Sequence, residues 1–507
     1  MLGLLRRLDR PVVVILAVTA LAGIVRFTHL SDPDGFVFDE LYYPKAACIM
    51  VGLDDETCRL DDTEKLFREQ RWDVGSYVHP DLGKWQIALG IKAFGMDPFG
   101  WRAATAGAGT LVVLVVAIMA QLLFRSTLWT AVAGLLAALE HLSVVLSRTA
   151  LLDTHLQLWV AVGSCFLLLD RRWLDRRVAG RAPAADGDHP SPVYSPVWRP
   201  WRFAAGAALG AAVAVKWSGA FAIVGAVLVV YTWETSRRRR SDMGTTRALG
   251  RAVARESFGV LLALAIVPLV VYTATWLPWL HHTGHDVMRD PVTSITAVAN
   301  EHADMWAYHG QDLQELDEGD DGARTPTHPY YSRPWRWPMM LRPVLFYSED
   351  LGPDIAQVLA IGNPALFWGC LIALPYLAFA WRRQRDWRAG FLLVAYLAQW
   401  LPWFAVARPQ FFFYALPLVP FMVLGMTYLL RQLADARIVL RDPDTGEVAQ
   451  DPETGAPAVS RQRPYLPFVV GYVVAAVALF VWFWPVLSAG RISDTHWRAI
   501  VWFEVWI

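Results

Sequence analysis

Cysteine is scarce in this chain: there are four among 507 residues, namely Cys48, Cys58, Cys165 and Cys370. That number is too small for a disulfide framework or for a site built from thiolate ligands. Cys48 and Cys58 are close in sequence, so they are able to pair if their compartment is oxidising. The sequence leaves the disulfide and the free thiols both open. A metal-binding spacing such as His-Glu-x-x-His is also absent, and no obligatory metal is predicted.

The chain also lacks net charge, because 46 basic and 46 acidic residues give a formal charge of zero at pH 7. The balance hides an uneven distribution, since arginine gathers in some connecting segments and acidic residues gather in others. The first apolar run has no small-residue cleavage site, so we expect a retained span and not a removable signal peptide. Nor does the chain contain two similar halves, which are common in transporters.

Long apolar runs dominate what the sequence does contain. Hydrophobic residues make up 55% of the chain and 25 residues are tryptophan. Runs of about twenty apolar residues recur, and each is long enough to cross roughly 30 Å of hydrocarbon. The sequence therefore predicts an all-α polytopic membrane protein with about eleven transmembrane helices. The predicted spans are 11–30, 101–124, 128–146, 149–169, two within 201–233, 258–280, 364–381, 389–404, 411–430 and 465–487.

Basic residues set the predicted orientation. Arg6, Arg7 and Arg10 precede the first span, which favours a cytoplasmic N-terminus. Segment 201–233 would be about 50 Å long as one helix, yet both of its flanks are rich in arginine. We therefore predict two short helices that turn on the external side near Lys216-Trp217-Ser218-Gly219. With this hairpin every arginine-rich connection is cytoplasmic and the C-terminus is external.

The predicted organisation is a single integral-membrane domain over 1–507 with three long connections. Two of them, 31–98 and 281–351, are external, and 432–463 is a flexible cytoplasmic loop. We expect amphipathic helices in the external loops, among them 41–51 and 82–94 in the first, lying on the membrane surface.

Two adjacent carboxylates, Asp39 and Glu40, follow the first span almost immediately. A carboxylate held at the membrane–water boundary, half out of water, has a raised pKa and suits the role of a general base. The alternative is an ordinary pair of solvated acids on a loop. The first external loop, 31–98, is thus the first place to look for a site.

Further ionisable residues gather on the same predicted face. They are His79, Lys84, Arg148, Asp153, Lys216 and Arg408. Cations of this kind would hold the phosphate of an anionic lipid-borne substrate, while a carboxylate takes a proton from the attacking nucleophile. Each has a structural alternative: Arg148 pairs with Asp153, Lys216 reaches to the lipid head groups, and His79 caps a loop.

Six stretches, taken together, resemble the protein O-mannosyltransferases. Phe38-Asp39-Glu40 is similar to the Asp-Glu motif of that family, and segment 79–84 is similar to its His-Pro-Pro-Leu-Gly-Lys stretch, with Asp81 in place of the second proline. Four more stretches follow in the family order: 148–154, 216–219, 332–335 and 408–417. The second external loop, 281–351, is too short for the folded repeat domain of the eukaryotic members. The resemblance is therefore to the bacterial, actinobacterial type.

The resemblance implies a GT-C fold and transfer of mannose, with inversion, from polyprenyl-phosphate mannose to Ser or Thr hydroxyls of proteins. The acceptors would be secreted or membrane proteins, with transfer during translocation as one option, on the external face of the plasma membrane. Membrane lipids are the other expected partners; nucleic acid and an obligatory cofactor are not expected. Asp39 would be the base and Glu40 would position it or the acceptor. Arg148, Lys216 and Arg408 would contact the donor phosphate, with Asp153, His79, Lys84 and Arg333 as further substrate-binding residues.

Two rival functions fit the same pattern. One is a lipid-linked sugar transferase whose acceptor is a lipid or glycan, such as an aminoarabinose or arabinofuranose transferase. The other is a transporter or lipid flippase. Transport is disfavoured because the charges cluster at one face and not near the midplane, and because repeated halves are absent.

Overall fold

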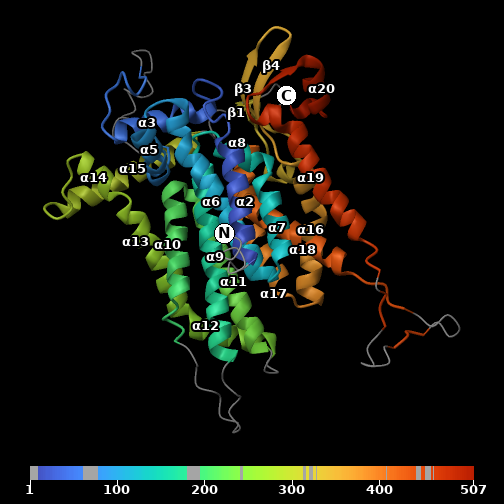
Figure 1. Cartoon of the computed structure of the whole chain (residues 1–507). Coiled ribbons are helices and arrows are strands. Elements are labelled where there is room, and N and C mark those ends of the chain that lie inside the picture. Colours follow the sequence, from blue (N-terminus) through green and yellow to red (C-terminus); the bar gives the residue numbers. More distant parts are fainter. Residues whose placement is uncertain are drawn as a thin grey trace, which may run out of the picture.

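The computed structural model describes residues 10–60, 78–179, 195–239, 244–311, 316–318, 324–326, 328–406, 408–440, 447–450, 458–460 and 462–506. Figure 1 shows a bundle of long helices with a cap of shorter helices and strands at one end. Parts of several predicted features lie outside the described residues: the basic N-terminus, the first external loop at 61–77, the arginine-rich connections at 180–194 and 240–243, parts of the second external loop, and parts of 432–463.

The bundle is made of helices that overlap the predicted spans. They are α2 (Arg10–Phe27), α6 (Pro98–Phe124), α7 (Thr127–Ala138), α8 (His141–Ser147), α9 (Leu152–Ala179), α10 (Pro200–Val215), α11 (Ala220–Arg239), α12 (Thr245–Leu261), η3 (Leu262–Ile266), α13 (Val267–Ala274), α16 (Pro364–Arg383), α17 (Trp387–Trp400), α18 (Val419–Asp435) and α19 (Leu466–Leu487). The bounds differ most at α12, which lies mostly before the predicted span 258–280.

Length and composition select eight helical segments of the described chain as able to cross a membrane. The number is nine if α7 and α8, which meet at a bend of 57°, form one broken span. The predicted spans at α10 and α17 are helical but short, with 16 and 14 residues. The helical membrane fold is confirmed, whereas the count of eleven and the sidedness stay predictions.

Helices α10 and α11 form the predicted hairpin, joined by the short turn η2 (Trp217–Gly219). Lys216 at the turn contacts Asp153 in the first turn of α9. At the far end of α9, Arg199 before α10 and Arg237 in α11 contact its carboxylates. The two helices therefore run antiparallel. Gly219 permits the tight turn, because a Cβ there would lie 2.5 Å from the backbone of α10.

The cap at the other end combines short helices with strands. Its helices are η1 (Phe38–Leu41), α3 (Tyr43–Met50), α5 (Leu82–Phe94), α14 (Leu277–His282), α15 (Pro291–Gln311), η4 (Pro334–Met339), η5 (Leu401–Ala405), η6 (Phe412–Leu418), α20 (Asp494–Ile500) and η7 (Glu504–Trp506). The predicted stretches 41–51 and 82–94 are thus helical, as α3 and α5. Whether they lie on a membrane surface stays a prediction.

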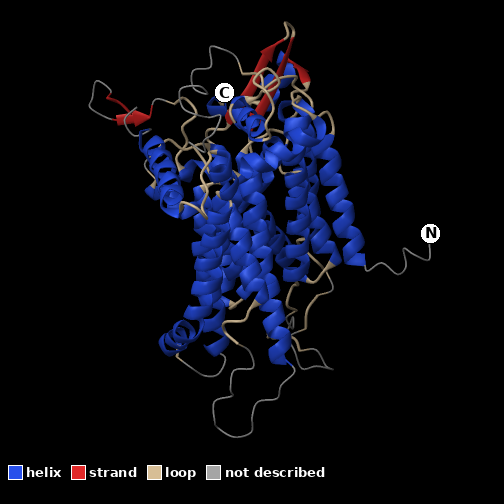
Figure 2. Ribbon diagram, turned by 90° about the vertical axis from the view of Figure 1, so that its left-hand side faces the viewer, coloured by secondary structure: helices blue, strands red, loops and turns tan. Residues whose placement is uncertain are grey.

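Strands correct the expectation of a purely helical chain. An antiparallel sheet has the order β3 (Val344–Asp350), β4 (Asp354–Ala360) and β5 (Arg491–Ser493), and β1 (Leu316–Glu318) pairs with β2 (Arg324–Pro326). Figure 2 shows the strands in two separate places at the capped end, beyond the helical bundle. The sheet joins the second long loop to the C-terminal segment. Strands β3 and β4 have seven residues each, but their apolar and polar residues do not alternate strictly, so the pattern typical of a strand is absent.

Cys48 at the end of α3 is bonded to Cys58, with a Cα–Cα distance of 5.6 Å. Cys165 and Cys370 are buried and free. The disulfide, which the sequence left open, closes a short loop directly after the Asp-Glu motif.

Candidate active site

Glu40 organises the loop that carries the Asp-Glu motif. Its carboxylate is fully buried and receives two bonds from the Arg102 guanidinium, of 2.9 Å to Oε1 and 2.8 Å to Oε2. Backbone amides of Val37 and Ala150 also donate to it. Arg102 further donates to three carbonyls of the loop, at Leu30, Pro33 and Gly35. Glu40 therefore holds the loop against α6 and α9 and has no oxygen left for a substrate.

Asp39 points elsewhere and is half-buried. The preceding residue, Phe38, has a left-handed backbone with φ of 53°, a conformation that costs energy for a bulky residue. Its ring is held by stacking on Phe346 at 4.4 Å. No side-chain hydrogen bond to Asp39 occurs within the described residues. Burial raises the pKa of Asp39 to about 7; nearby Lys216 opposes this rise and Asp153 adds to it.

Lys216 lies where α10 ends, with extended backbone that begins the hairpin turn. Its Nζ is 3.1 Å from Asp153 Oδ1 and 3.3 Å from Oδ2. The same ammonium lies 4.5 Å from the centre of the Tyr414 ring, a favourable cation–π arrangement. Asp39, Asp153, Lys216 and Tyr414 thus form one charged cluster, drawn from four separate parts of the chain.

A cavity of about 480 Å³ opens beside this cluster. Its lining combines two cations and two histidines with aromatic and small side chains: His79, Lys216, Trp217, Ser218, Phe221, Trp306, His309, Trp403, Ala405, Val406 and Arg408. Asp39 is not part of the lining and adjoins it through Lys216. A pocket with cationic groups at one side and aromatic walls suits an anionic, partly apolar ligand.

Arg408 is fixed by two neighbours within the cavity wall. Its guanidinium donates to His309 Nδ1 and, at 3.1 Å, to the Tyr414 hydroxyl. His309 Nε2 in turn donates to the Val78 carbonyl, which sets the neutral tautomer. Burial and the cations Arg408 and Lys216 lower the pKa of His309 to about 3. The positive charge of the cavity therefore belongs to Lys216 and Arg408.

His79 lies opposite, with its ring 5.2 Å from that of His309. Burial and the surrounding cations hold the pKa of His79 well below its usual value. His79 is therefore a neutral residue of the cavity wall. It offers a polar contact but adds no positive charge to those of Lys216 and Arg408.

Four predicted substrate-binding residues lie outside the cavity lining: Asp153, which contacts the lining residue Lys216, and Lys84, Arg148 and Arg333. Lys84 is buried and donates to the His79 carbonyl at 3.0 Å and to Asp81 at 3.1 Å, so it clamps the loop before α5. Arg148 donates to the carbonyls at the end of α2, among them Thr28 and His29. Arg333 is exposed at the start of η4. The expected alternative pairing of Arg148 with Asp153 is also wrong, because Lys216 occupies that carboxylate.

Sequence reasoning missed several residues of the site. Tyr414 and Trp217 lie inside stretches that carried the family resemblance, so the resemblance could have identified them as candidates. Trp306 and His309 come from α15, in a loop with no distinguishing pattern, and only folding brings them to the cavity. Within the described residues, no group of three or more His, Cys, Asp or Glu side chains could hold a metal ion.

The fold is shared with a solved yeast structure. The Saccharomyces cerevisiae protein O-mannosyltransferase Pmt1–Pmt2 complex bound to the sugar donor matches with a TM-score of 0.69 at 12% identity, covering 98% of this chain and 93% of the other. The chain therefore has the multi-pass helical fold of that structure, which is of the GT-C type.

Sequence comparison gives the family. Residues 16–283 match the model of dolichyl-phosphate-mannose-protein mannosyltransferase, and 298–506 match the C-terminal four-transmembrane region of protein O-mannosyltransferase. The polyprenol-phosphate-mannose–protein mannosyltransferase of Mycobacterium tuberculosis is 32% identical over 96% of this chain and 90% of its own length. That of Corynebacterium glutamicum is 29% identical over 99% and 94%. The chain belongs to the protein O-mannosyltransferase family, and the predicted resemblance is confirmed.

Proposed function

We propose that this protein transfers mannose from a polyprenyl-phosphate-mannose donor to Ser or Thr hydroxyls of proteins. The names of its mycobacterial and corynebacterial relatives support this donor and this acceptor class. The observation that carries the proposal is the half-buried Asp39 carboxylate beside Lys216, at the edge of a cavity whose charge comes from two cations. In this proposal Asp39 is the base and the two cations bind the phosphate, so the two groups that glycosyl transfer from a phosphate requires would adjoin.

The donor phosphate would lie between Lys216 and Arg408. The Tyr414 ring contacts the Lys216 ammonium, and the Tyr414 hydroxyl accepts a hydrogen bond from Arg408. Tyr414 therefore fixes the distance between the two cations. Lys216 is paired with Asp153. A bound phosphate would share that ammonium, and the charge-assisted bonds would strengthen as negative charge develops on the leaving oxygen. The aromatic walls Trp217 and Trp306 suit the sugar face and the first prenyl units.

In the proposed reaction the acceptor hydroxyl attacks the anomeric carbon as the bond from that carbon to the phosphate oxygen breaks. Asp39 takes the hydroxyl proton, and polyprenyl phosphate leaves with the bonding electron pair. A single displacement inverts the anomeric centre. A carboxyl pKa near 7 is well matched to this role, since a general base works best when its pKa is close to the working pH.

The other predicted residues take supporting roles in this proposal. Glu40 positions Asp39 through Arg102, Asp153 orients Lys216, and His79 contributes a neutral polar wall. Lys84 and Arg148 build the loops that frame the site. Arg333 receives no role. We further propose that the site faces the external side of the plasma membrane, with secreted or membrane proteins as acceptors and transfer during translocation as one route.

The test is a transfer assay with radiolabelled polyprenyl-phosphate mannose in detergent or proteoliposomes. A Ser/Thr-rich peptide should acquire label, and the same peptide with every Ser and Thr replaced by Ala should not. Label found only in a lipid or glycan fraction would instead indicate the rival transferase class. Movement of intact donor across the bilayer without transfer would indicate a flippase.

A further inference from the structure

A second and larger cavity lies at the opposite end of the helical bundle. It encloses about 850 Å³ and is lined from α9, α11, α12, α16, α17 and the turn between the last two. Along α9, Asp175 at this cavity is about 33 Å from Asp153 at the candidate active site, at 1.5 Å per residue. That separation matches the hydrocarbon thickness of a bilayer. The cavity is therefore at the other membrane boundary.

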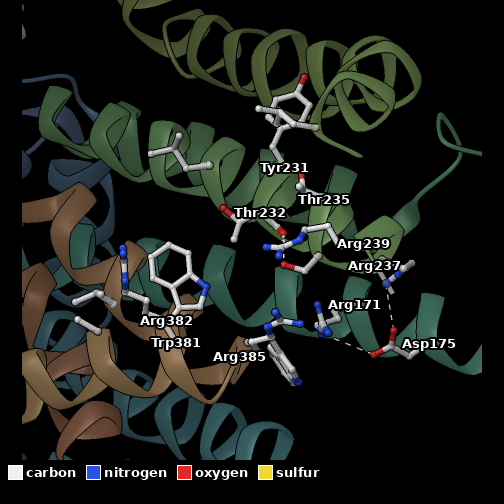
Figure 3. A pocket seen from close by; sticks show the side chains of 16 residues that line it. Arg171, Asp175, Tyr231, Thr232, Thr235, Arg237, Arg239, Trp381, Arg382 and Arg385 are labelled. Atoms are coloured by element: carbon white, nitrogen blue, oxygen red, sulfur yellow. Dashed lines mark hydrogen bonds and ion pairs between the residues drawn. The ribbon is translucent and has the colours of Figure 1, made fainter. Parts of the chain in front are cut away.

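The cavity is strongly cationic. Figure 3 shows the guanidinium groups of Arg171, Arg237, Arg239, Arg382 and Arg385, drawn from separate segments, around one space. Among its described residues the lining contains one carboxylate, Asp175, which is 3.1 Å from Arg237 and 3.7 Å from Arg171; Glu234, outside the lining, is 3.6 Å from Arg237. No ion pair joins Arg239, Arg382 or Arg385 to another of the described residues. A concentration of arginines with so little compensation favours an anion with several acceptor oxygens.

The rest of the lining is apolar or aromatic. Leu228, Leu249, Ala378 and Leu393 supply an aliphatic wall, with the indoles of Trp381 and Trp387. Tryptophan at a membrane boundary packs against acyl chains while it faces the head-group region. The cavity is thus amphipathic, which suits a lipid and not a freely soluble anion.

The backbone at Arg385, in the turn after α16, is left-handed with φ of 55°, where glycine is strongly preferred. Replacing Arg385 by glycine therefore removes the side chain without adding backbone strain. Arg171 lies 4.0 Å from the centre of the Trp387 ring and 5.0 Å from that of Trp233, so its guanidinium is held in one orientation at the cavity wall.

We propose that this cavity binds the phosphate-bearing head group of an anionic phospholipid from the leaflet opposite the candidate active site. The arginines bind the phosphate oxygens, and the aliphatic wall receives the upper acyl chains. This site is separate from the donor site and independent of the proposed reaction. The occupant would join α9 and α11 to the α16–α17 turn, which touch one another here.

The test compares lipid binding in purified full-length protein by native mass spectrometry and by thermal shift in detergent. Phosphatidylglycerol and a phosphatidylcholine with the same chains are the two lipid probes, and inorganic phosphate is the soluble one. The variants are Arg385→Gly and Arg382→Gln. Arg383→Gln is the matched control, because Arg383 is an exposed arginine of the same helix end that does not line the cavity.

We expect phosphatidylglycerol to bind and to raise Tm, and each cavity variant to bind it about tenfold more weakly, the loss of one charge-assisted contact. Arg385→Gly should keep or raise Tm without lipid, since glycine relieves the left-handed strain; a purely structural role would lower it. Equal binding of phosphatidylcholine, the same shift from inorganic phosphate alone, or equal weakening by Arg383→Gln would each overturn the proposal.

Discussion

Glu40 accepts two hydrogen bonds from Arg102, at 2.9 and 2.8 Å, with both side chains fully buried. The neighbouring Asp39 makes no such bond within the described chain. The two adjacent carboxylates of the motif therefore differ: Glu40 is fully engaged in hydrogen bonds that hold the fold, whereas Asp39 remains available to react. Substitution of Glu40 should therefore affect stability, and substitution of Asp39 should affect catalysis.

Glu40→Ala should destabilise the protein, because it leaves the Arg102 guanidinium buried without its partner. Breaking one side of a buried ion pair costs about 3–5 kcal/mol, which thermal unfolding of the purified protein will measure. Glu56→Ala removes an exposed acid from the same loop and should change stability by less than about 0.5 kcal/mol. Equal stability of the two variants would refute the anchoring role of Glu40.

Lys216→Gln and Arg408→Gln should each weaken use of the lipid donor. A charge-assisted hydrogen bond is worth about 1.5–3 kcal/mol, so kcat/KM for the donor should fall about ten- to hundredfold. Arg333→Gln, which removes an exposed arginine outside the cavity lining, should leave it unchanged. The measurement is kcat/KM for the donor with the purified variants. An unaltered value for Lys216→Gln would show that Lys216 only pairs with Asp153 and does not bind the donor.

The pH dependence should follow the pKa of Asp39, which burial raises to about 7. The base acts as the carboxylate, so kcat/KM should be level above pH 7 and should fall about tenfold per unit at lower pH. Lys216 lowers this pKa, so Lys216→Gln should move the acidic limb to higher pH. A limb that stays at the same pH in that variant, or a profile that is flat from pH 5 to 8, contradicts the assignment.

Sidedness is testable by labelling single cysteines in intact cells. Ala220 is exposed at the start of α11, directly after the turn that borders the candidate active site, and Arg239 is exposed at the other end of that helix. Ala220→Cys should react with a membrane-impermeant maleimide from outside, and Arg239→Cys should react only after permeabilisation. The two native free thiols are buried, so the parent protein gives a low background. External labelling of Arg239→Cys would reverse the predicted orientation.

Much of the architecture could be predicted from the sequence because a helix that crosses a membrane needs a long run of apolar residues, which is easily recognised. Basic flanks even located the turn at Lys216. The hairpin of β3 and β4, which pairs Val344 with Ala360, is local in the chain and was missed. The pairing of β4 with β5 could not be predicted, since the partners are about 140 residues apart in the chain, as with Ile355 and Ile492. Register between such segments depends on the packed fold and leaves no local pattern.

The candidate site was only partly predictable for a similar reason. The sequence identifies which residues carry charge. It does not show which of these charges are paired within the fold and which remain available to a ligand. Lys216 and Arg408 reach the cavity, whereas Arg148 caps the end of α2 and Lys84 clamps its own loop. A charge near a membrane boundary is equally suited to either use. His309, which positions Arg408, carried no sequence signal because its contact joins residues 99 positions apart.

The measurement that tests the central claim most directly is turnover of Asp39→Asn. A serine or threonine hydroxyl is a poor nucleophile, so displacement at the anomeric carbon depends on a base beside the attacking oxygen. The substitution keeps the size of the side chain and removes the base. Mannose transfer to a Ser/Thr peptide should fall about 10²–10⁴-fold, while thermal stability and binding of the donor stay near those of the parent. A stable Asp39→Asn protein that transfers mannose at the parental rate would contradict the proposed mechanism.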